Sequence, residues 1–232
     1  MSGLPAKNVV DIPELRDRVN VFRDRTHAGE LLAGILDSYR NSDAIVLGIP
    51  AGGVPVAAVI AEHLDLHFDV LVVSKITLPW NTEAGYGAVA FDGSVRLNEK
   101  LLPRLGLSNQ EIEQGIETTF QKVTHRAKSL RGERAFPDIS DRSVILVDDG
   151  LASGFTLLVG VEALRKANAN RIIVAVPTGH GQSVQMMAQH VETVFCSNIR
   201  QGWNFAVADA YQRWSDVPDE EVVRILKQIM PE

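Results

Sequence analysis

Short apolar runs alternate along this chain with longer segments whose apolar residues recur at helical spacing. Consecutive apolar residues predict strands that are buried on both faces. Such runs lie at residues 44–49, 69–74, 144–147, 171–176 and 191–196. Helical spacing predicts helices between them, at residues 31–39, 56–63, 155–167 and 182–190. This alternation of strand and helix predicts an α/β fold with a doubly wound, mainly parallel sheet.

The middle of the chain departs from this alternation. The dipeptide Asp92-Gly93 separates two short segments of strand character and is a strong hairpin signal. Ser108 and Glu111 have the spacing of a capping box, which predicts that a long polar helix begins there. We therefore expect a hairpin and helical excursion from the sheet at about residues 80–136.

Composition narrows the class of protein. The 232 residues fit a single domain spanning residues 1–232, and 45% of them are hydrophobic, which is enough for a sizeable core. The net charge of -6 argues against nucleic acid as the main partner. Residues 1–11 lack the pattern of a signal peptide, and no apolar run reaches the roughly 18 residues of a membrane span. We expect a cytoplasmic protein that acts on small molecules, without a membrane partner.

The only cysteine, Cys196, excludes a disulfide within the chain. It lies in a predicted strand, so we interpret it as a small buried side chain and not as a nucleophile. Thr26 is the expected N-cap of the first helix. Arg23 and Arg25 are interpreted as solvated residues at the start of that helix.

The chain's most informative stretch is 144–156, Val-Ile-Leu-Val-Asp-Asp-Gly-Leu-Ala-Ser-Gly-Phe-Thr. Asp148 and Asp149 lie where the buried strand should end, and a loop with two glycines then opens a helix. Ligands of open α/β sheets bind at the carboxyl ends of the strands. Such a loop suits a phosphate, whereas the carboxylates suit hydroxyl groups or a hydrated Mg²⁺. The ligand implied is a sugar phosphate.

These residues resemble the phosphoribosyl-pyrophosphate motif of type I phosphoribosyltransferases. That motif has an apolar strand, two acidic residues and then Gly-x-x-Thr-Gly-x-Thr or a close variant. Ser153 stands at the first threonine position and keeps its hydroxyl, whereas Phe155 replaces a residue that is commonly small. An ordinary strand with an acidic end is the alternative, and the length of the motif favours the resemblance. The resemblance extends over roughly residues 22–225.

The resemblance implies transfer of a phosphoribosyl group from phosphoribosyl pyrophosphate to a nitrogenous acceptor such as a nucleobase, with Mg²⁺. Asp148 and Asp149 are then the catalytic and metal-binding carboxylates. The residues implied to bind the phosphoribosyl group are Gly150, Ala152, Ser153, Gly154, Phe155 and Thr156. The expected assembly is a homodimer.

Two further segments extend the implied site. Residues 48–55 resemble the pyrophosphate-binding loop of the same family, with Ala51, Gly52 and Gly53 as substrate-binding residues. A plain tight turn would also explain two glycines. Lys75, just past the predicted strand 69–74, is a candidate catalytic residue for the phosphates, and a solvated lysine is the alternative.

Residues 75–98 are similar to a subgroup of bacterial and archaeal phosphoribosyltransferase-like proteins whose acceptors are unassigned. Family members place a small hood near the C-terminus to hold the acceptor base, here expected at about 198–216. Phe205 could stack on a flat base there, or the hood aromatics could form only a core. Two other functions stay open: a non-catalytic sensor of phosphoribosyl pyrophosphate, and a hydrolase or phosphorylase acting on a ribosyl phosphate.

Overall fold

The computed structural model describes residues 6–229, without the side chains of residues 82 and 83. Within that range, six parallel strands form a central sheet in the order β1-β9-β8-β7-β2-β3. Their bounds are β1 Val9–Val10, β2 Ile45–Gly48, β3 His67–Val70, β7 Ser143–Val147, β8 Arg171–His180 and β9 Thr193–Arg200. The predicted doubly wound, mainly parallel sheet is confirmed.

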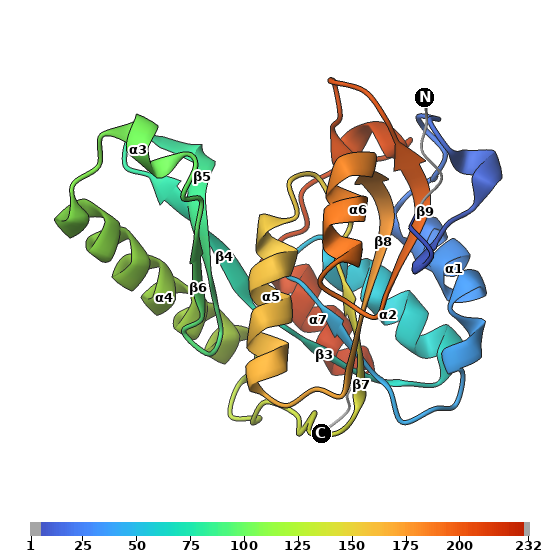
Figure 1. The fold of residues 1–232 in the computed structure, drawn as a ribbon. Coiled ribbons are helices and arrows are strands. Elements are labelled where there is room, and N and C mark those ends of the chain that lie inside the picture. The colour runs from blue at the N-terminus through green and yellow to red at the C-terminus, as the bar shows by residue number, and fades with distance from the viewer. Residues whose placement is uncertain (1–5, 230–232) are drawn as a thin grey trace.

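Helices cover both faces of this sheet (Figure 1). They are α1 Arg25–Ile35, α2 Gly53–Leu64, α5 Phe155–Lys166, α6 Gly181–Ala188 and α7 Asp219–Ile229. Successive residues of one strand are buried under different helices. Leu146 packs in the cluster that contains α5 and α6, whereas Ile145 packs with α1, α2 and α7. This two-sided burial explains why the strands read as continuous apolar runs. Among the described residues, no helix has both the length and the hydropathy of a membrane span.

A second sheet, antiparallel and built of β4, β5 and β6, lies to one side of the central sheet within the described range (Figure 1). Its strands are β4 Val73–Leu78, β5 Asn81–Ala90 and β6 Val95–Leu97, followed by α3 Leu102–Leu105 and α4 Asn109–Arg131. The hairpin at Asp92-Gly93 is confirmed, with Gly93 at a φ of 81°. The capping box of Ser108 and Glu111 is confirmed as well.

The predicted strand 69–74 is wrong in its bounds. The run Val70–Val73 spans the end of β3 and the start of β4, and all four side chains are buried. The chain passes from one core to another without a polar residue, so hydropathy alone cannot show the change of sheet. The excursion therefore begins at Val73 instead of residue 80.

The first helix also begins differently from the prediction. Asp24, not Thr26, is the N-cap of α1, and its side chain accepts a hydrogen bond of 3.0 Å from the backbone N–H of His27. Arg25 consequently occupies the first turn. The residues before α1 pack on the expected hood, because the N–H of Phe22 donates to Ala210 O and the N–H of Gln212 donates to Phe22 O.

Three short 3₁₀ turns complete the described structure, at Pro13–Leu15, Asp37–Tyr39 and Val207–Ala210. The last of them lies in the predicted hood, where Tyr211 and Phe22 pack in a small separate cluster. Residues from the start of the chain therefore pack against this C-terminal segment.

Candidate functional site

Two loops lie side by side at the carboxyl edge of the central sheet. The parallel register pairs Gly48 with Val147, so β2 and β7 end at the same level. A Cβ atom on Gly53 would lie 2.7 Å from the carbonyl oxygen of Val147 and 2.8 Å from the Cα of Asp148. The structure thus brings together the predicted residues 51–53 and the acidic pair.

The loop after β2 packs directly on the second acid. A Cβ atom on Gly52 would lie 1.9 Å from Oδ2 of Asp149, so only glycine fits there. The peptide bond between Pro50 and Ala51 is cis. Within residues 6–229 the amides of Ala51 and Gly52 donate no hydrogen bond. These two N–H groups are available to an anion.

The loop after β7 is held by β8 and opens α5. Leu151 donates its N–H to Thr178 O at 2.8 Å and accepts from the N–H of His180 at 2.9 Å. Gly154, with a φ of 77°, then turns the chain into the helix, and Phe155 N–H donates to Ser153 Oγ.

This second loop also offers free donors. In the described part of the chain, the backbone N–H groups at positions 152, 153, 154 and 156 have no acceptor. They lie at the N-terminus of a helix of 12 residues, where the peptide dipoles give a partial positive charge. The arrangement fits a phosphate group, as the sequence predicts for this loop.

Each carboxylate of the acidic pair has one oxygen anchored by the protein. Oδ1 of Asp148 accepts the N–H of Asp149 at 2.9 Å. Oδ2 of Asp149 accepts from Nε and Nη2 of Arg25 at 3.0 and 2.8 Å. No other described residue donates to Oδ2 of Asp148 or to Oδ1 of Asp149. One oxygen of each carboxylate is therefore available to a diol or to a hydrated cation.

The electrostatics of the pair favour a cation. Burial and the neighbouring Asp149 charge hold the pKa of Asp148 well above its usual range, against the opposing charges of Lys75 and Arg25. Burial also raises the pKa of Asp149, against the opposing charge and hydrogen bonds of Arg25. The protein therefore does not fully compensate the negative charge of the two ionised carboxylates, and a bound metal ion would do so.

The donor set suits Mg²⁺ shared with a substrate. Among the described residues, no group of three or more His, Cys, Asp or Glu side chains could enclose a metal ion. Magnesium commonly takes one or two carboxylates and completes its shell with water and phosphate oxygens. Asp148 and Asp149 fit that pattern, as the sequence predicts.

Lys75 occupies a different element from the one expected. It is exposed on β4 of the second sheet, paired with Ala88, instead of following a strand of the central sheet. Its ammonium charge nevertheless acts on the acidic pair, because it lowers the pKa of Asp148 against the effect of burial. The positive charge of Lys75 therefore partly offsets the effect of burial on Asp148.

Arg25 is the site residue that sequence reasoning missed. Its interpretation as a solvated residue is wrong, because only 11% of its side chain is exposed and it forms an ion pair with Asp149. Its guanidinium carbon also lies 4.0 Å from the centre of the Trp214 ring. No local pattern indicates this role, since the partner carboxylate is 124 positions away.

The aromatic side chains beside the acidic pair are Tyr211 and Trp214. Tyr211 donates its hydroxyl hydrogen to the carbonyl oxygen of Asp149 at 2.6 Å. Burial, with the Asp149 charge, raises the pKa of Tyr211 well above its usual range. Phe205 instead packs edge-on against His180 and lies 5.0 Å from the guanidinium of Arg200. Stacking of an acceptor base on Phe205 stays a prediction.

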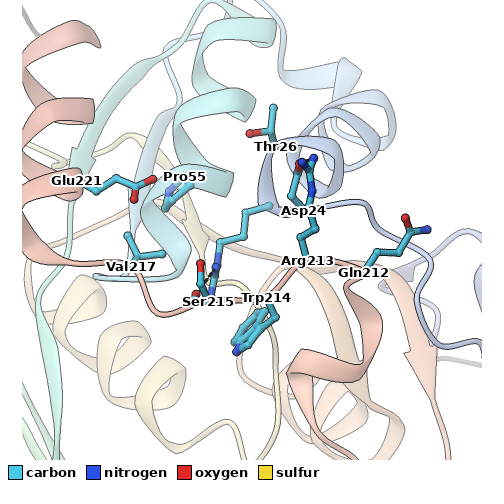
Figure 2. Close-up of a pocket in the computed structure, with 10 residues that line it drawn as sticks. Asp24, Thr26, Pro55, Gln212, Arg213, Trp214, Ser215, Val217 and Glu221 are labelled. Atoms are coloured by element: carbon cyan, nitrogen blue, oxygen red, sulfur yellow. Dashed lines mark hydrogen bonds and ion pairs between the residues drawn. The ribbon is translucent and has the colours of Figure 1, made fainter.

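A pocket of about 570 Å³ lies between α1, α2, α7 and the segment 212–217. Arg25 lines it together with Trp214 and Ser215, and Figure 2 shows Asp24 and Arg213 side by side within it. Nη2 of Arg213 forms an ion pair with Oδ2 of Asp24. Arg25 therefore contacts the acidic pair and also lines this pocket.

Comparison with known proteins agrees with this arrangement. The model of the family described as "Phosphoribosyl transferase domain" matches residues 24–211, so the chain belongs to that family. The range includes both loops, the acidic pair, Lys75 and Arg25.

Two relatives are informative. A protein of Mycobacterium tuberculosis with the provisional name phosphoribosyl transferase is 32% identical over 208 residues, which cover 90% of this chain and 47% of that protein. The chain thus spans about half the length of the curated relatives it matches. The crystal structure of TT1426 from Thermus thermophilus has a TM-score of 0.74 and 32% identity, covering 89% of this chain and 98% of that one.

Proposed function

We propose that the protein transfers a phosphoribosyl group from phosphoribosyl pyrophosphate to a nitrogenous acceptor, for example a nucleobase, and releases pyrophosphate. The supporting observation is the pair of free carboxylate oxygens between two loops with free backbone N–H groups. A ligand with a phosphate, a vicinal diol and a pyrophosphate presents the groups that these three features bind. Family membership gives the same general chemistry.

The phosphoribosyl end of the donor binds at the loop after β7. The free N–H groups at positions 152, 153, 154 and 156 hold the 5′-phosphate, and α5 adds its positive end. Oδ2 of Asp148 and Oδ1 of Asp149 accept hydrogen bonds from the ribose hydroxyls. As the C1–oxygen bond to pyrophosphate breaks, the ring becomes oxocarbenium-like, and the two carboxylates stabilise the developing positive charge.

The leaving group binds at the loop after β2. The amides of Ala51 and Gly52 and the ammonium group of Lys75 neutralise part of its negative charge. Mg²⁺, when bound at Asp148 and Asp149, would supply further positive charge to the pyrophosphate oxygens. The acceptor nitrogen attacks C1 directly, so no cysteine, serine or histidine is required as a nucleophile.

One experiment tests the reaction class. The protein is incubated with phosphoribosyl pyrophosphate, Mg²⁺ and a panel of nucleobases, and products are separated by chromatography. Nucleotide and pyrophosphate together support the transferase. Ribose 5-phosphate without nucleotide would indicate a hydrolase instead, and tight binding without turnover would indicate a sensor.

Paired variants tie the result to the site. Asp148→Asn and Asp149→Asn are expected to fold normally and to weaken donor binding or turnover, because an amide cannot stabilise positive charge as a carboxylate does. Variants that melt early yet turn over normally once folded would show that the pair has a structural role only.

A further inference from the structure

Arg25 is fixed on three sides. Two of its N–H groups donate to Oδ2 of Asp149, and Nη1 donates to the carbonyl oxygen of Ser215 at 2.9 Å. The guanidinium also lies over the Trp214 ring at 4.0 Å. A planar fork held by a carboxylate, a carbonyl and an aromatic face has little freedom to rotate.

The consequence for Asp149 is a fixed carboxylate orientation. The terminal torsion of an aspartate is normally broad, so a free carboxylate samples many directions. Here Oδ2 is held between Arg25 and the backbone of Gly52, where a Cβ atom would lie only 1.9 Å away. With Oδ2 held, Oδ1 is kept in one position and receives no hydrogen bond from another described residue.

We propose that Arg25 is a positioning residue for recognition of the sugar diol. It orients Asp149 so that Oδ1 accepts a ribose hydroxyl, and it does so by tying that carboxylate to residues 214–215. The inference rests on the proposed function, in which Asp149 binds the ribose. In this role Arg25 acts through Asp149 instead of binding the ligand itself.

The same side chain links two parts of the molecule. Trp214 and Ser215 line the pocket of about 570 Å³ with Arg25, whereas Asp149 lies on the other side of the guanidinium. A shift of the 214–215 segment therefore moves the arginine and, through it, the free oxygen of Asp149. Trp214→Ala is expected to have the same effect as loss of Arg25, but weaker, because the Ser215 carbonyl remains.

The neighbouring Arg213 provides a matched control. It lies in the same pocket and forms an ion pair with Asp24, but 76% of its side chain is exposed. It has no hydrogen bond to Asp149. Arg213→Ala removes the same charge from the same region without touching the acidic pair.

The test compares two probes of the donor site by isothermal titration calorimetry. Ribose 5-phosphate carries the hydroxyls, whereas inorganic phosphate occupies the same loop without them. Arg25→Ala should weaken the binding of ribose 5-phosphate roughly 10- to 100-fold, as expected when a charged hydrogen-bonding group is no longer oriented. The affinity of the same variant for inorganic phosphate should change by less than about twofold. Arg213→Ala should alter neither affinity.

Arg25→Lys keeps the charge but cannot reach Asp149, Ser215 and Trp214 together, so an intermediate loss for ribose 5-phosphate is expected. If Arg25→Ala does not fold, Arg25→Lys is compared with the wild type in its place. Equal losses for both probes, or no loss in either variant, would overturn the positioning role alone. If the wild-type protein binds ribose 5-phosphate no better than phosphate, that result would instead contradict the diol site and the proposed function as well.

Discussion

The loops after β2 and β7 lie at the same edge of one sheet, yet they are built in different ways. The loop after β7 is bonded to β8 at Leu151 and ends at Gly154, which supplies the left-handed turn into α5. The loop after β2 is shaped by distant residues: Gly52 packs on Asp149, and Arg126 of α4 donates to the carbonyl oxygen of Pro50 at 3.4 Å.

The two loops differ in how closely they pack on the rest of the site. Both open a helix, since Gly52 is the N-cap of α2 and Gly154 that of α5. A Cβ atom on Gly52 would meet a carboxylate oxygen, whereas one on Gly154 would meet only the ends of flexible side chains. The loop after β2 should therefore be the more sensitive to single substitutions.

The largest expected effect is that of Gly52→Ala. The added methyl group would overlap Oδ2 of Asp149, so both the loop amides and the carboxylate must move. We expect a loss of roughly 100- to 1000-fold in kcat/KM, as found when anion-binding donors or reacting groups are displaced by about 1 Å. Steady-state kinetics with the acceptor found in the nucleobase panel measures it. Gly34→Ala, on an open face of α1 with no atom within 4 Å, should leave turnover unchanged.

Lys75→Ala comes next, because it removes one exposed charge without moving the backbone. A contact that strengthens as pyrophosphate leaves should lower the rate more than the binding. We expect kcat/KM to fall roughly 10- to 1000-fold, with only partial recovery in Lys75→Arg. The kinetic constants of both variants test this role. If Lys75→Ala keeps the kcat/KM of the wild type, Lys75 does not act in the site.

Gly154→Ala should have a smaller effect, mostly on stability. Its neighbours, Met186 Cε at 2.9 Å and Leu151 Cδ1 at 3.1 Å, are flexible side-chain ends, so the positive φ dominates the cost. That cost is about 1–2 kcal/mol, or roughly 2–8 °C in Tm. Ribose 5-phosphate affinity should fall several-fold. Gly106→Ala, at a φ of 66° with no atom within 4 Å, should match the Tm loss without the loss of affinity.

The smallest expected effect is a gain in stability for Asp148→Asn. Burial and Asp149 raise the pKa of Asp148, so its ionised form is less favourable in the folded protein than in the unfolded chain. The wild-type protein therefore loses stability as pH rises from below the unfolded pKa through the folded one. The neutral amide avoids that loss and keeps its oxygen as acceptor for the N–H of Asp149.

Melting curves measured without metal test whether Asp148→Asn is more stable than the wild type. Asp148→Asn should melt above the wild type at about pH 7–8, and the difference should shrink toward about pH 3–4, where the wild-type carboxyl is protonated as well. Asp216→Asn, an exposed residue outside the site, should show no such trend. A variant that melts below the wild type at neutral pH would mean that the ionised carboxylate stabilises the fold.

What could be predicted from the sequence follows the same division between local and distant contacts. The strands β2, β7, β8 and β9, the acidic pair and the start of α5 lie in continuous segments, and the sequence indicates each of them, whereas the two-residue strand β1 gives no such signal. The boundary between β3 and β4 was not predicted, because Val70–Val73 is apolar throughout while the chain changes sheets. Lys75 was consequently assigned to the wrong element.

Arg25 shows the limit more clearly. Its sequence neighbours describe only the start of a helix, and every contact that defines its role comes from Asp149, Trp214 and Ser215. Arg126 is a second case, since a basic helix end gives no sign that one of its side chains reaches the loop at Pro50. A single sequence encodes such contacts only through the completed fold.

The long chain separations around Arg25 also bear on how the protein is made. Its bonds reach 124 positions forward to Asp149 and 190 positions forward to Ser215. At about 5–20 residues per second, a ribosome adds those last residues roughly 10–40 s after Arg25. The sheet can begin to form on the nascent chain during that interval, but the arginine bridge cannot. The carboxylate of Asp149 should therefore receive its full set of contacts only late in synthesis, at about the time when α7 packs on the core.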